Sequence, residues 1–344
     1  MNISQTNIDL LRELLSKPSQ KIVVLSHTNP DGDAVGSTLA MCHFLLSMGK
    51  EAVVVLPNVF PAFLSWVPGA DDVLFYDKEK ERCDTAIAEA DVLFCLDFNV
   101  LSRTGDVCGS LLSSSAKKVL VDHHPQPSDE FDVLVSHPEA CSTCELVFRV
   151  ITALGGTVAL NFEMAQCIYT GMMTDTGGFT YNSNDREIYY IISELLSKGI
   201  DKDEIYRKVF NTHSEGRLRL MGYVLYDKMQ VFPEFNSALI WLDASEQKRF
   251  QYKKGDTEGF VNIPLSIKDV RFSVFLREDA EKKMIKVSLR SVGTFPCNKV
   301  AAEFFNGGGH LNASGGEFYG PMEEAINLFK QALVKYQDLL LAKN

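Results

Sequence analysis

The sequence predicts an α/β protein with two domains, the larger of which contains a doubly wound, mainly parallel sheet. Three observations lead to this expectation. A chain of 344 residues exceeds what a single hydrophobic core usually serves. Short valine-rich apolar runs, which are typical of buried parallel strands, alternate with helical stretches in the first half of the chain. Strands return from about residue 229, after a helical stretch, and predict a second, smaller α/β domain.

The first half of the chain predicts helices and strands in alternation. A helix over residues 7–17 precedes the first strand, 22–25, and a second helix over 34–48 follows a turn that contains proline and glycine. Further strands are expected at residues 51–56, 73–76, 92–96, 119–121 and 133–135. Ser142 and Glu145 have the spacing of a capping box, which predicts the start of another helix. Strands that are separated by helices form a parallel sheet with helices on both faces.

Helices dominate the middle of the chain, and a second group of strands follows. Helices are predicted over residues 185–196 and 201–226, the latter interrupted by polar residues at 211–216. The expected parts are an α/β domain, a helical connector and a second α/β domain, over residues 1–200, 201–228 and 229–344. Within the last domain, the expected strands are 238–242, 271–277 and 284–290, and the expected helices are 299–305 and 322–341.

Carboxylate and imidazole side chains follow several of the predicted strands. In chain order they are His27, Asp31, Asp33, Asp97, His123 and Asp175. Open α/β sheets bind ligands just beyond the carboxyl ends of their strands, so we expect these side chains to share one cleft. So many carboxylates in one cleft would repel one another unless divalent cations neutralised them. Oxygen and imidazole ligands without thiolate suit Mn²⁺, with Mg²⁺ as the alternative, and six ligands are enough for two ions that share a bridging carboxylate.

Each of these residues also has an ordinary structural interpretation. Asp31 lies in a turn where proline and glycine are common, and an aspartate after a strand is often only the N-cap of the next helix. The argument for a metal site is repetition, because four successive segments end in acid or histidine at what should be the same edge of the sheet.

The same motifs, in the same order, resemble those of the DHH phosphoesterase superfamily. They are the segment from His27 to Ser37, the single Asp97, the triplet Asp122-His123-His124, the segment from Thr174 to Gly177, and Gly307-Gly308-Gly309-His310. The resemblance spans nearly the whole chain. The glycine motif and the length are similar to those of the branch that degrades very short RNA and dephosphorylates adenosine 3′,5′-bisphosphate. The resemblance implies a two-Mn²⁺ hydrolase with an α/β catalytic domain and a C-terminal substrate-binding domain.

The resemblance also implies a role for each residue. One ion would be bound by His27 and Asp31. The other ion would be bound by Asp33, His123 and Asp175. Asp97 would be the catalytic bridge between the two ions. His124 would face the substrate, either to protonate the leaving oxygen or to hold the phosphate, and Asp122 would orient the imidazoles. The substrate-binding residues would be Arg103, Arg290, Gly307, Gly308, Gly309 and His310. By themselves, the three glycines would indicate a helix C-cap, and it is the match of the following residues to the family that favours a ligand-binding role.

The charge of the chain limits the kind of nucleic acid that it would bind. A net charge of -11 repels polyanions, and a basic stripe is missing from the sequence. Two bound cations would add about +4 at the site. We therefore expect short single-stranded RNA oligonucleotides or a mononucleotide bisphosphate as partners, and neither duplexes nor long strands.

The N-terminus and the cysteines indicate the cellular compartment in which the protein is expected. The first residues lack the pattern of a signal peptide, and no apolar run is long enough to span a bilayer, so we expect a cytoplasmic protein without a membrane partner. The eight cysteines show no disulfide spacing and lie mostly in apolar segments, as expected of reduced, buried thiols.

Other functions share parts of this pattern. An inorganic pyrophosphatase or exopolyphosphatase, or a cyclic-dinucleotide phosphodiesterase of the same superfamily, would use the same metal motifs. A nucleotide-binding module without catalysis is the furthest alternative, because binding alone does not need six metal-ligating groups. The oligomeric state stays open, with a homodimer among the alternatives.

Overall fold

The computed structural model describes residues 3–253 and 255–342. They form two compact units, unit 1 at Met1–Thr212 and unit 2 at His213–Asn344. Residues 201–228, expected as a separate connector, are divided between the units, with one helix in each. Within the described part of the chain, no helix combines the length and the apolar character that crossing a membrane requires.

Unit 1 contains a parallel sheet with the strand order β3-β2-β1-β4-β5-β6. The strands are β1 (Lys21–Leu25), β2 (Glu51–Leu56), β3 (Leu74–Phe75), β4 (Val92–Leu96), β5 (Lys117–Asp122) and β6 (Val133–Ser136). The chain runs outward from β1 to β3 and then returns to place β4 on the other side of β1. The strand order therefore reverses between β1 and β4, and such a reversal opens a crevice at the carboxyl ends of the strands. The doubly wound sheet that the sequence predicts is confirmed.

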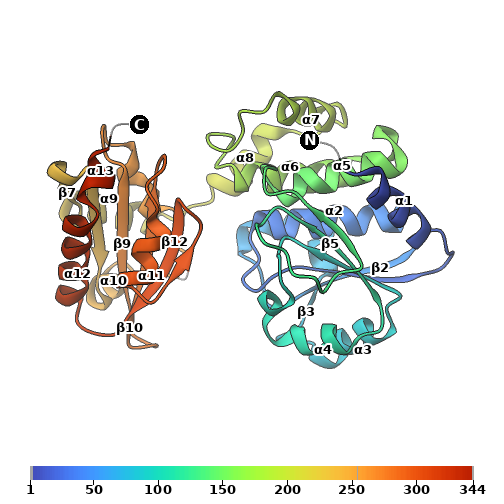
Figure 1. Cartoon of the computed structure of the whole chain (residues 1–344), viewed down its shortest axis with the longest axis horizontal. Helices are drawn as coiled ribbons and strands as arrows, with labels where there is room; N and C mark the ends of the chain where they lie inside the picture. The colour runs from blue at the N-terminus through green and yellow to red at the C-terminus, as the bar shows by residue number, and fades with distance from the viewer. Residues whose placement is uncertain (1–2, 254, 343–344) are drawn as a thin grey trace. The chain divides into compact units, whose positions relative to one another are not determined.

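Helices cover both faces of this sheet (Figure 1). The helices on one face are α1 (Gln5–Leu14), α2 (Gly32–Ser47), α5 (Thr143–Gly155) and α6 (Phe162–Asp175), and those on the other are α3 (Lys80–Glu89) and α4 (Cys108–Ser113). Outside the first layer, α7 (Arg186–Ser197) and α8 (Lys202–Phe210) pack against α6.

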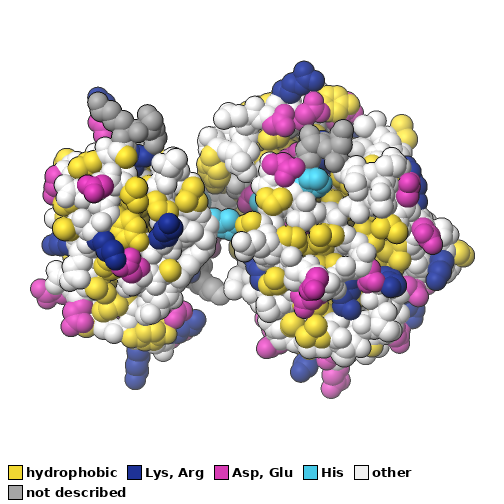
Figure 2. Space-filling model, in the orientation of Figure 1, with side chains coloured by type: hydrophobic (Ala, Val, Ile, Leu, Met, Phe, Trp, Pro, Cys, Tyr) yellow, Lys and Arg dark blue, Asp and Glu magenta, His cyan; other side chains and the backbone are white. Residues whose placement is uncertain are grey.

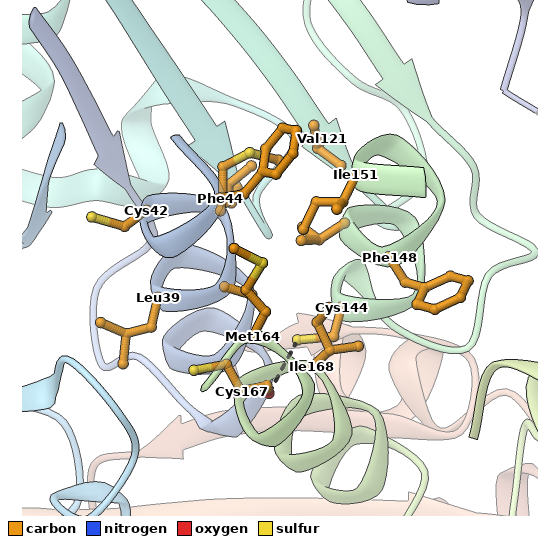
Figure 3. Close-up of a cluster of buried hydrophobic side chains, with 14 of the residues drawn as sticks. Leu39, Cys42, Phe44, Val121, Cys144, Phe148, Ile151, Met164, Cys167 and Ile168 are labelled. Carbon is orange, nitrogen blue, oxygen red and sulfur yellow. Dashed lines mark hydrogen bonds between the residues drawn. The ribbon is translucent and has the colours of Figure 1, made fainter. Parts of the chain in front are cut away.

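The largest core of unit 1 lies where α2, α5 and α6 meet the sheet (Figure 3). Leu39 of α2, Ile151 of α5 and Ile168 of α6 are buried there, and each such side chain stabilises the fold by about 1.5–3 kcal/mol. The thiol of Cys144 on α5 points to the carbonyl oxygen of Cys167 on α6, with 3.9 Å between sulfur and oxygen. This packing fixes the N-termini of α2 and α5 against the C-terminus of α6, and the candidate site uses all three helix ends.

Unit 2 contains a mixed sheet with the strand order β11-β12-β10-β9-β8-β7, antiparallel except for the pair β8 and β9. The strands are β7 (Gln230–Phe232), β8 (Ser237–Leu242), β9 (Phe272–Asp279), β10 (Met284–Ser291), β11 (Gly308–Gly309) and β12 (Ala313–Phe318). The helices are α9 (Glu215–Asp227), α10 (Ala244–Arg249), α11 (Cys297–Phe304), α12 (Met322–Lys335) and α13 (Gln337–Leu341). One face of the sheet packs on α11 and α12, and the other face packs on α9.

Some elements differ from the sequence predictions. Strand β12 was not predicted, because a segment with two glycines and no β-branched residue has little β propensity, and its pairing with β10 supplies the strand geometry. The expected helix over 201–226 is two helices, α8 and α9. The expected helix over 322–341 is also two, α12 and α13, which meet at Tyr336.

Candidate metal centre

Three adjacent strands of unit 1 end in the predicted ligands. His27 lies two residues after β1, Asp97 directly follows β4, and His123 directly follows β5. Because these strands are parallel neighbours, the three side chains lie at the same edge of the sheet, on either side of the strand-order reversal. Asp97 has a φ of 67°, which is uncommon for a residue other than glycine, and its amide donates to the carbonyl of Val121 at 3.2 Å.

Asp31 caps the helix that follows β1. Its Oδ1 atom accepts the amides of Asp33 and Ala34, each at 3.1 Å, so the structural interpretation of this aspartate is right. The same side chain also forms a compact group with His27 and Asp97, in which the ligand atoms lie within 4.8 Å of one another. One carboxylate can serve both purposes, because the cap occupies only one of its two oxygens.

Asp33 is held by the N-terminus of α5. Its Oδ2 accepts the amide of Thr143 at 2.6 Å, and its Oδ1 accepts the amide of Cys144 at 2.9 Å. The Thr143 hydroxyl donates to Oδ1 of Asp97 at 2.9 Å. A helix N-terminus stabilises anions, so α5 fixes two of the carboxylates at once. Sequence reasoning missed this role of Thr143, although the capping box at Ser142 marked the start of the helix that provides it.

Asp175, the last residue of α6, reaches the same place from a fourth segment. Its Oδ2 lies 3.6 Å from Nε2 of His123. The preceding Thr174 packs so closely on Gly32 that a Cβ at Gly32 would lie 2.3 Å from the Thr174 hydroxyl oxygen. This contact, which only glycine allows, brings the end of α6 to the start of α2.

Asp97 lies between two groups of ligands. Its Oδ2 is 3.4 Å from Nε2 of His27, and its Oδ1 is 3.7 Å from Nε2 of His123. One group contains His27, Asp31 and Asp97, another contains Asp33, His123 and Asp175, and a third joins Asp97 with His123 and His124. The separations exceed those of good hydrogen bonds, and they match the roughly 3–4 Å between neighbouring ligands of an ion with bonds of about 2.1 Å. The residues therefore fit two divalent cations with Asp97 between them.

Both imidazoles are oriented as metal ligands usually are. The Nδ1 atom of His27 pairs with the carbonyl of Thr28 at 2.9 Å, and Nδ1 of His123 pairs with the carbonyl of Ala140 at 3.3 Å. Each Nδ1 therefore carries a proton, which leaves the lone pair of Nε2 to face Asp97. The neighbouring carbonyls thus fix the tautomer that binds a cation.

His124 has a different environment. Its Nδ1 lies 2.7 Å from Oδ1 of Asp122, a buried carboxylate whose other oxygen accepts no hydrogen bond within the described part of the chain. Asp122 was expected to orient the imidazoles in general, and the structure pairs it with His124 alone among them. A carboxylate behind Nδ1 orients the ring and leaves Nε2 to face outward, which suits a group that exchanges a proton at Nε2.

The pKa values of the carboxylates in the centre are shifted in different directions. Burial, together with the charges of Asp97 and Asp175, raises the pKa of Asp33 well above its usual value. Burial likewise raises the pKa of Asp175 to about 7. Burial acts in the same direction on Asp97, but the neighbouring imidazoles, first of all that of His27, outweigh it and lower the pKa of Asp97. Without cations, the ionised forms of Asp33 and Asp175 are therefore disfavoured, as expected of a site built for positive ions.

The predicted substrate-binding residues lie in both units. Arg103 belongs to unit 1, where its carbonyl accepts the amide of Thr28 at 2.9 Å, beside His27. In unit 2, Arg290 of β10 pairs with Ala313 of β12, and its Nη1 donates to the carbonyl of Leu289 at 2.9 Å. Arg290 therefore lies next to the glycine motif, because β12 also pairs with β11.

The three glycines of that motif are not a helix C-cap. The left-handed position after α11 is Asn306, with a φ of 45°. Gly307 and Gly309 are required by packing, since a Cβ on them would lie 2.0 Å from the carbonyl of Gly315 and 2.6 Å from that of Ala313. A Cβ on Gly308 would have no heavy atom within 4 Å among the described residues. Only Gly308 therefore has space for a ligand against its backbone.

Comparisons with known proteins agree with these motifs. The N-terminal domain of the DHH family matches residues 21–172, and the DHHA1 domain matches residues 237–337. The bifunctional oligoribonuclease and PAP phosphatase NrnA of Thermus thermophilus is 30% identical to the chain, over 90% of this chain and 88% of that protein. The chain belongs to the DHH family. It is a phosphoesterase, a hydrolase of phosphate esters. The NrnA of Bacillus subtilis is a further relative of this DHH protein, 24% identical over 87% of this chain and 89% of the relative.

Solved structures of the DHH family share the fold. An exopolyphosphatase-related protein from Bacteroides fragilis is 60% identical, with a TM-score of 0.96 over 99% of both chains. A RecJ from Thermus thermophilus, solved in complex with Mn²⁺, has a TM-score of 0.55 at 14% identity, over 97% of this chain and 54% of RecJ. This second likeness concerns the fold alone.

Proposed function

We propose that this DHH protein hydrolyses very short oligoribonucleotides and adenosine 3′,5′-bisphosphate with two bound Mn²⁺ ions. The observation that carries the proposal is the position of Asp97, whose Oδ2 faces Nε2 of His27 and whose Oδ1 faces Nε2 of His123, so that it belongs to more than one candidate group of ligands. A carboxylate that bridges two cations is the arrangement that activates water and neutralises a phosphoryl group. The names of the NrnA relatives support the choice of substrates.

The proposed ligands of one ion are His27, Asp31 and Asp97, and those of the other are Asp33, Asp97, His123 and Asp175. Cations held by these residues would lower the pKa of a water molecule and neutralise charge on the phosphate. The N-terminus of α5 holds Asp33 and Asp97 in place through Thr143, so little rearrangement of the protein is needed during the reaction. With Asp122 behind it, His124 protonates the leaving oxygen from Nε2.

The charge distribution supports a small substrate. On the face that Figure 2 shows, the coloured Lys and Arg side chains are scattered among Asp and Glu and form no continuous basic track. With a net charge of -11, a long polyanion would gain little from such a surface. We assign catalysis to unit 1 and recognition of the nucleotide to Arg290, Gly308 and His310 of unit 2. We also propose a cytoplasmic location, which the eight free cysteines support.

Hydrolysis of phosphoanhydrides is a second candidate. It is favoured by the name of the 60% identical Bacteroides fragilis protein, which is described as exopolyphosphatase-related. The metal centre would serve both reactions, because both transfer a phosphoryl group to water.

One experiment separates the two candidates. The protein, loaded with Mn²⁺, is supplied in separate reactions with adenosine 3′,5′-bisphosphate, dinucleotide RNA, pyrophosphate, polyphosphate and a cyclic dinucleotide, and kcat/KM is measured for each. We expect the bisphosphate and the dinucleotide to have the highest values. Preference for pyrophosphate or polyphosphate would favour the second candidate and contradict the first.

A further inference from the structure

The chain makes an unusual turn directly after Asp175. Gly177, Gly178 and Phe179 follow one another with φ values of 56°, 73° and 63°, all in the left-handed region. The hydroxyl of Thr176 accepts the amide of Phe179 at 3.0 Å and so closes the turn. A non-glycine residue in this region is uncommon, and three successive left-handed residues define one specific path for the chain.

This turn places the ring of Tyr181 on Gly177. The amide of Tyr181 donates to the carbonyl of Thr176 at 3.2 Å, and a Cβ on Gly177 would lie 2.3 Å from Cε1 of the tyrosine ring. Tyr181 is nevertheless 56% exposed. Phe179 behaves differently, because its ring packs on Tyr169 with 5.6 Å between centroids and joins the core. The turn therefore supports one edge of the Tyr181 ring and leaves much of it open to solvent.

The turn is also tied to the metal centre. Gly177 lies two residues after Asp175, so their α-carbons are at most about 7 Å apart. Asp175 contacts His123, and Thr174 packs on Gly32 at the start of α2, which anchors the beginning of the turn on the proposed ligands. A fixed, half-exposed aromatic ring thus stands within the reach of one nucleotide from the proposed metal ligands.

We propose that Tyr181 stacks on the nucleobase next to the phosphate that is hydrolysed. This inference rests on the proposed function, and it adds the group that recognises the base. Aromatic rings bind any base through its π-face, which suits an enzyme for short RNA of any sequence. Stacking needs no positive charge, so it gives affinity for nucleotides to a protein with a net charge of -11. It also favours nucleotides over pyrophosphate, which has no base.

The test compares two substrates that differ only in the base. They are adenosine 3′,5′-bisphosphate and its abasic analogue, in which hydrogen replaces adenine. We expect Tyr181→Ala to lower kcat/KM about 10-fold to 100-fold for the nucleotide and to change it little for the analogue. Tyr181→Phe should retain most activity, since it keeps the ring. Tyr181→Leu, which still covers Gly177 but has no π-face, should behave like Tyr181→Ala. Tyr189→Ala is the matched control, because Tyr189 on α7 is 53% exposed.

The outcomes distinguish the inference from the function on which it rests. Mn²⁺ affinity and the unfolding temperature are measured for every variant, so that only folded, metal-binding proteins are compared. An equal loss on both substrates would mean that the ring merely holds Asp175 in place, and unchanged kinetics would mean that it does not touch the base. Either result overturns the inference and leaves the proposed function intact. Failure of the wild-type protein to hydrolyse the nucleotide would overturn both.

Discussion

The candidate metal centre of unit 1 and the glycine hairpin of unit 2 present their side chains and backbone in opposite ways. In the centre, side chains from four segments hold one another, and Asp33 and Asp97 are almost completely buried. In the hairpin of β11 and β12, the main chain is fixed by packing, while Gly308 and His310 are exposed. The comparison teaches that the charges in the centre depend on one another, whereas the hairpin presents exposed groups on a main chain that packing holds in place.

Removal of the metal should have the largest effect and should be confined to unit 1. We expect a chelator to abolish hydrolysis, and Mn²⁺ to restore it better than Mg²⁺, because the ligands include two imidazoles. Unit 1 should also unfold at a lower temperature without metal, since bound cations stabilise the state that binds them. The two tryptophans separate the units, with Trp66 in unit 1 and Trp241 in unit 2. In a Trp66→Phe variant the remaining Trp241 reports the unfolding of unit 2, and in a Trp241→Phe variant the remaining Trp66 reports the unfolding of unit 1. Full activity after exhaustive chelation would contradict the two-metal proposal.

The second largest effect should come from substitution of Asp97, the residue proposed to bridge the two ions. Asp97→Asn weakens a contact to both proposed ions, and we expect kcat to fall about a thousandfold, or ~4 kcal/mol of transition-state stabilisation. The measurement is steady-state kinetics at saturating Mn²⁺, with circular dichroism to verify folding. Asp106→Asn, at an exposed acid in unit 1, is the control. Near-normal turnover by a folded Asp97→Asn variant would rule out the bridge.

In the hairpin, substitution of two glycines should distinguish an effect on the stability of unit 2 from an effect on nucleotide binding. Gly309→Ala places a Cβ against the carbonyl of Ala313 at a φ of 138°, so it should destabilise unit 2 by about 2 kcal/mol or more. Gly308→Ala meets open space and should leave the unfolding temperature unchanged while raising KM for nucleotides. Chemical denaturation followed by Trp241 fluorescence and kinetics check the two variants. Equal stability of both would show that the packing argument is wrong.

Substitution of the residues proposed to recognise the nucleotide in unit 2 should weaken substrate binding and leave metal binding unchanged. Arg290→Ala and His310→Ala are expected to raise KM about tenfold, with Mn²⁺ affinity by calorimetry unchanged. If these groups also position the phosphate, kcat falls as well. Unchanged kinetics in both variants would require another assignment for unit 2.

The smallest expected effect concerns the stability of the metal-free protein, in which the carboxyl group of Asp175 is buried. Burial raises the pKa of Asp175 to about 7, so the folded, metal-free protein holds a proton that the unfolded chain releases near pH 4. The stability of the metal-free protein should therefore fall as the pH rises from about 4 to about 7. Asp175→Asn removes this penalty and should stabilise the metal-free protein by about 1 kcal/mol at pH 8, with little effect at pH 4. Thermal unfolding at the two pH values checks the sign, and a lower melting temperature of the variant at pH 8 would contradict it.

Much of the fold and of the proposed site can be predicted from the sequence. The valine-rich strands, the acids and histidines that follow them, and the two-domain organisation are local patterns, and local patterns are visible in one sequence. The left-handed turn after Asp175 is partly visible as well, through Gly177 and Gly178. The path that places Tyr181 on Gly177 is not, because Phe179 gives no sequence signal for a positive φ.

By itself, the sequence determined which residues end the strands of the parallel sheet and therefore which residues meet at one edge. Only the tertiary structure decided which partners these residues have and which further strand forms. The amides of Thr143 and Cys144 bind Asp33 across more than a hundred residues, Asp122 pairs with His124 and not with His123, and β12 exists only because β10 pairs with it. These choices depend on how α2, α5 and α6 pack and on strand register, and no local propensity encodes contacts between segments so far apart in the chain.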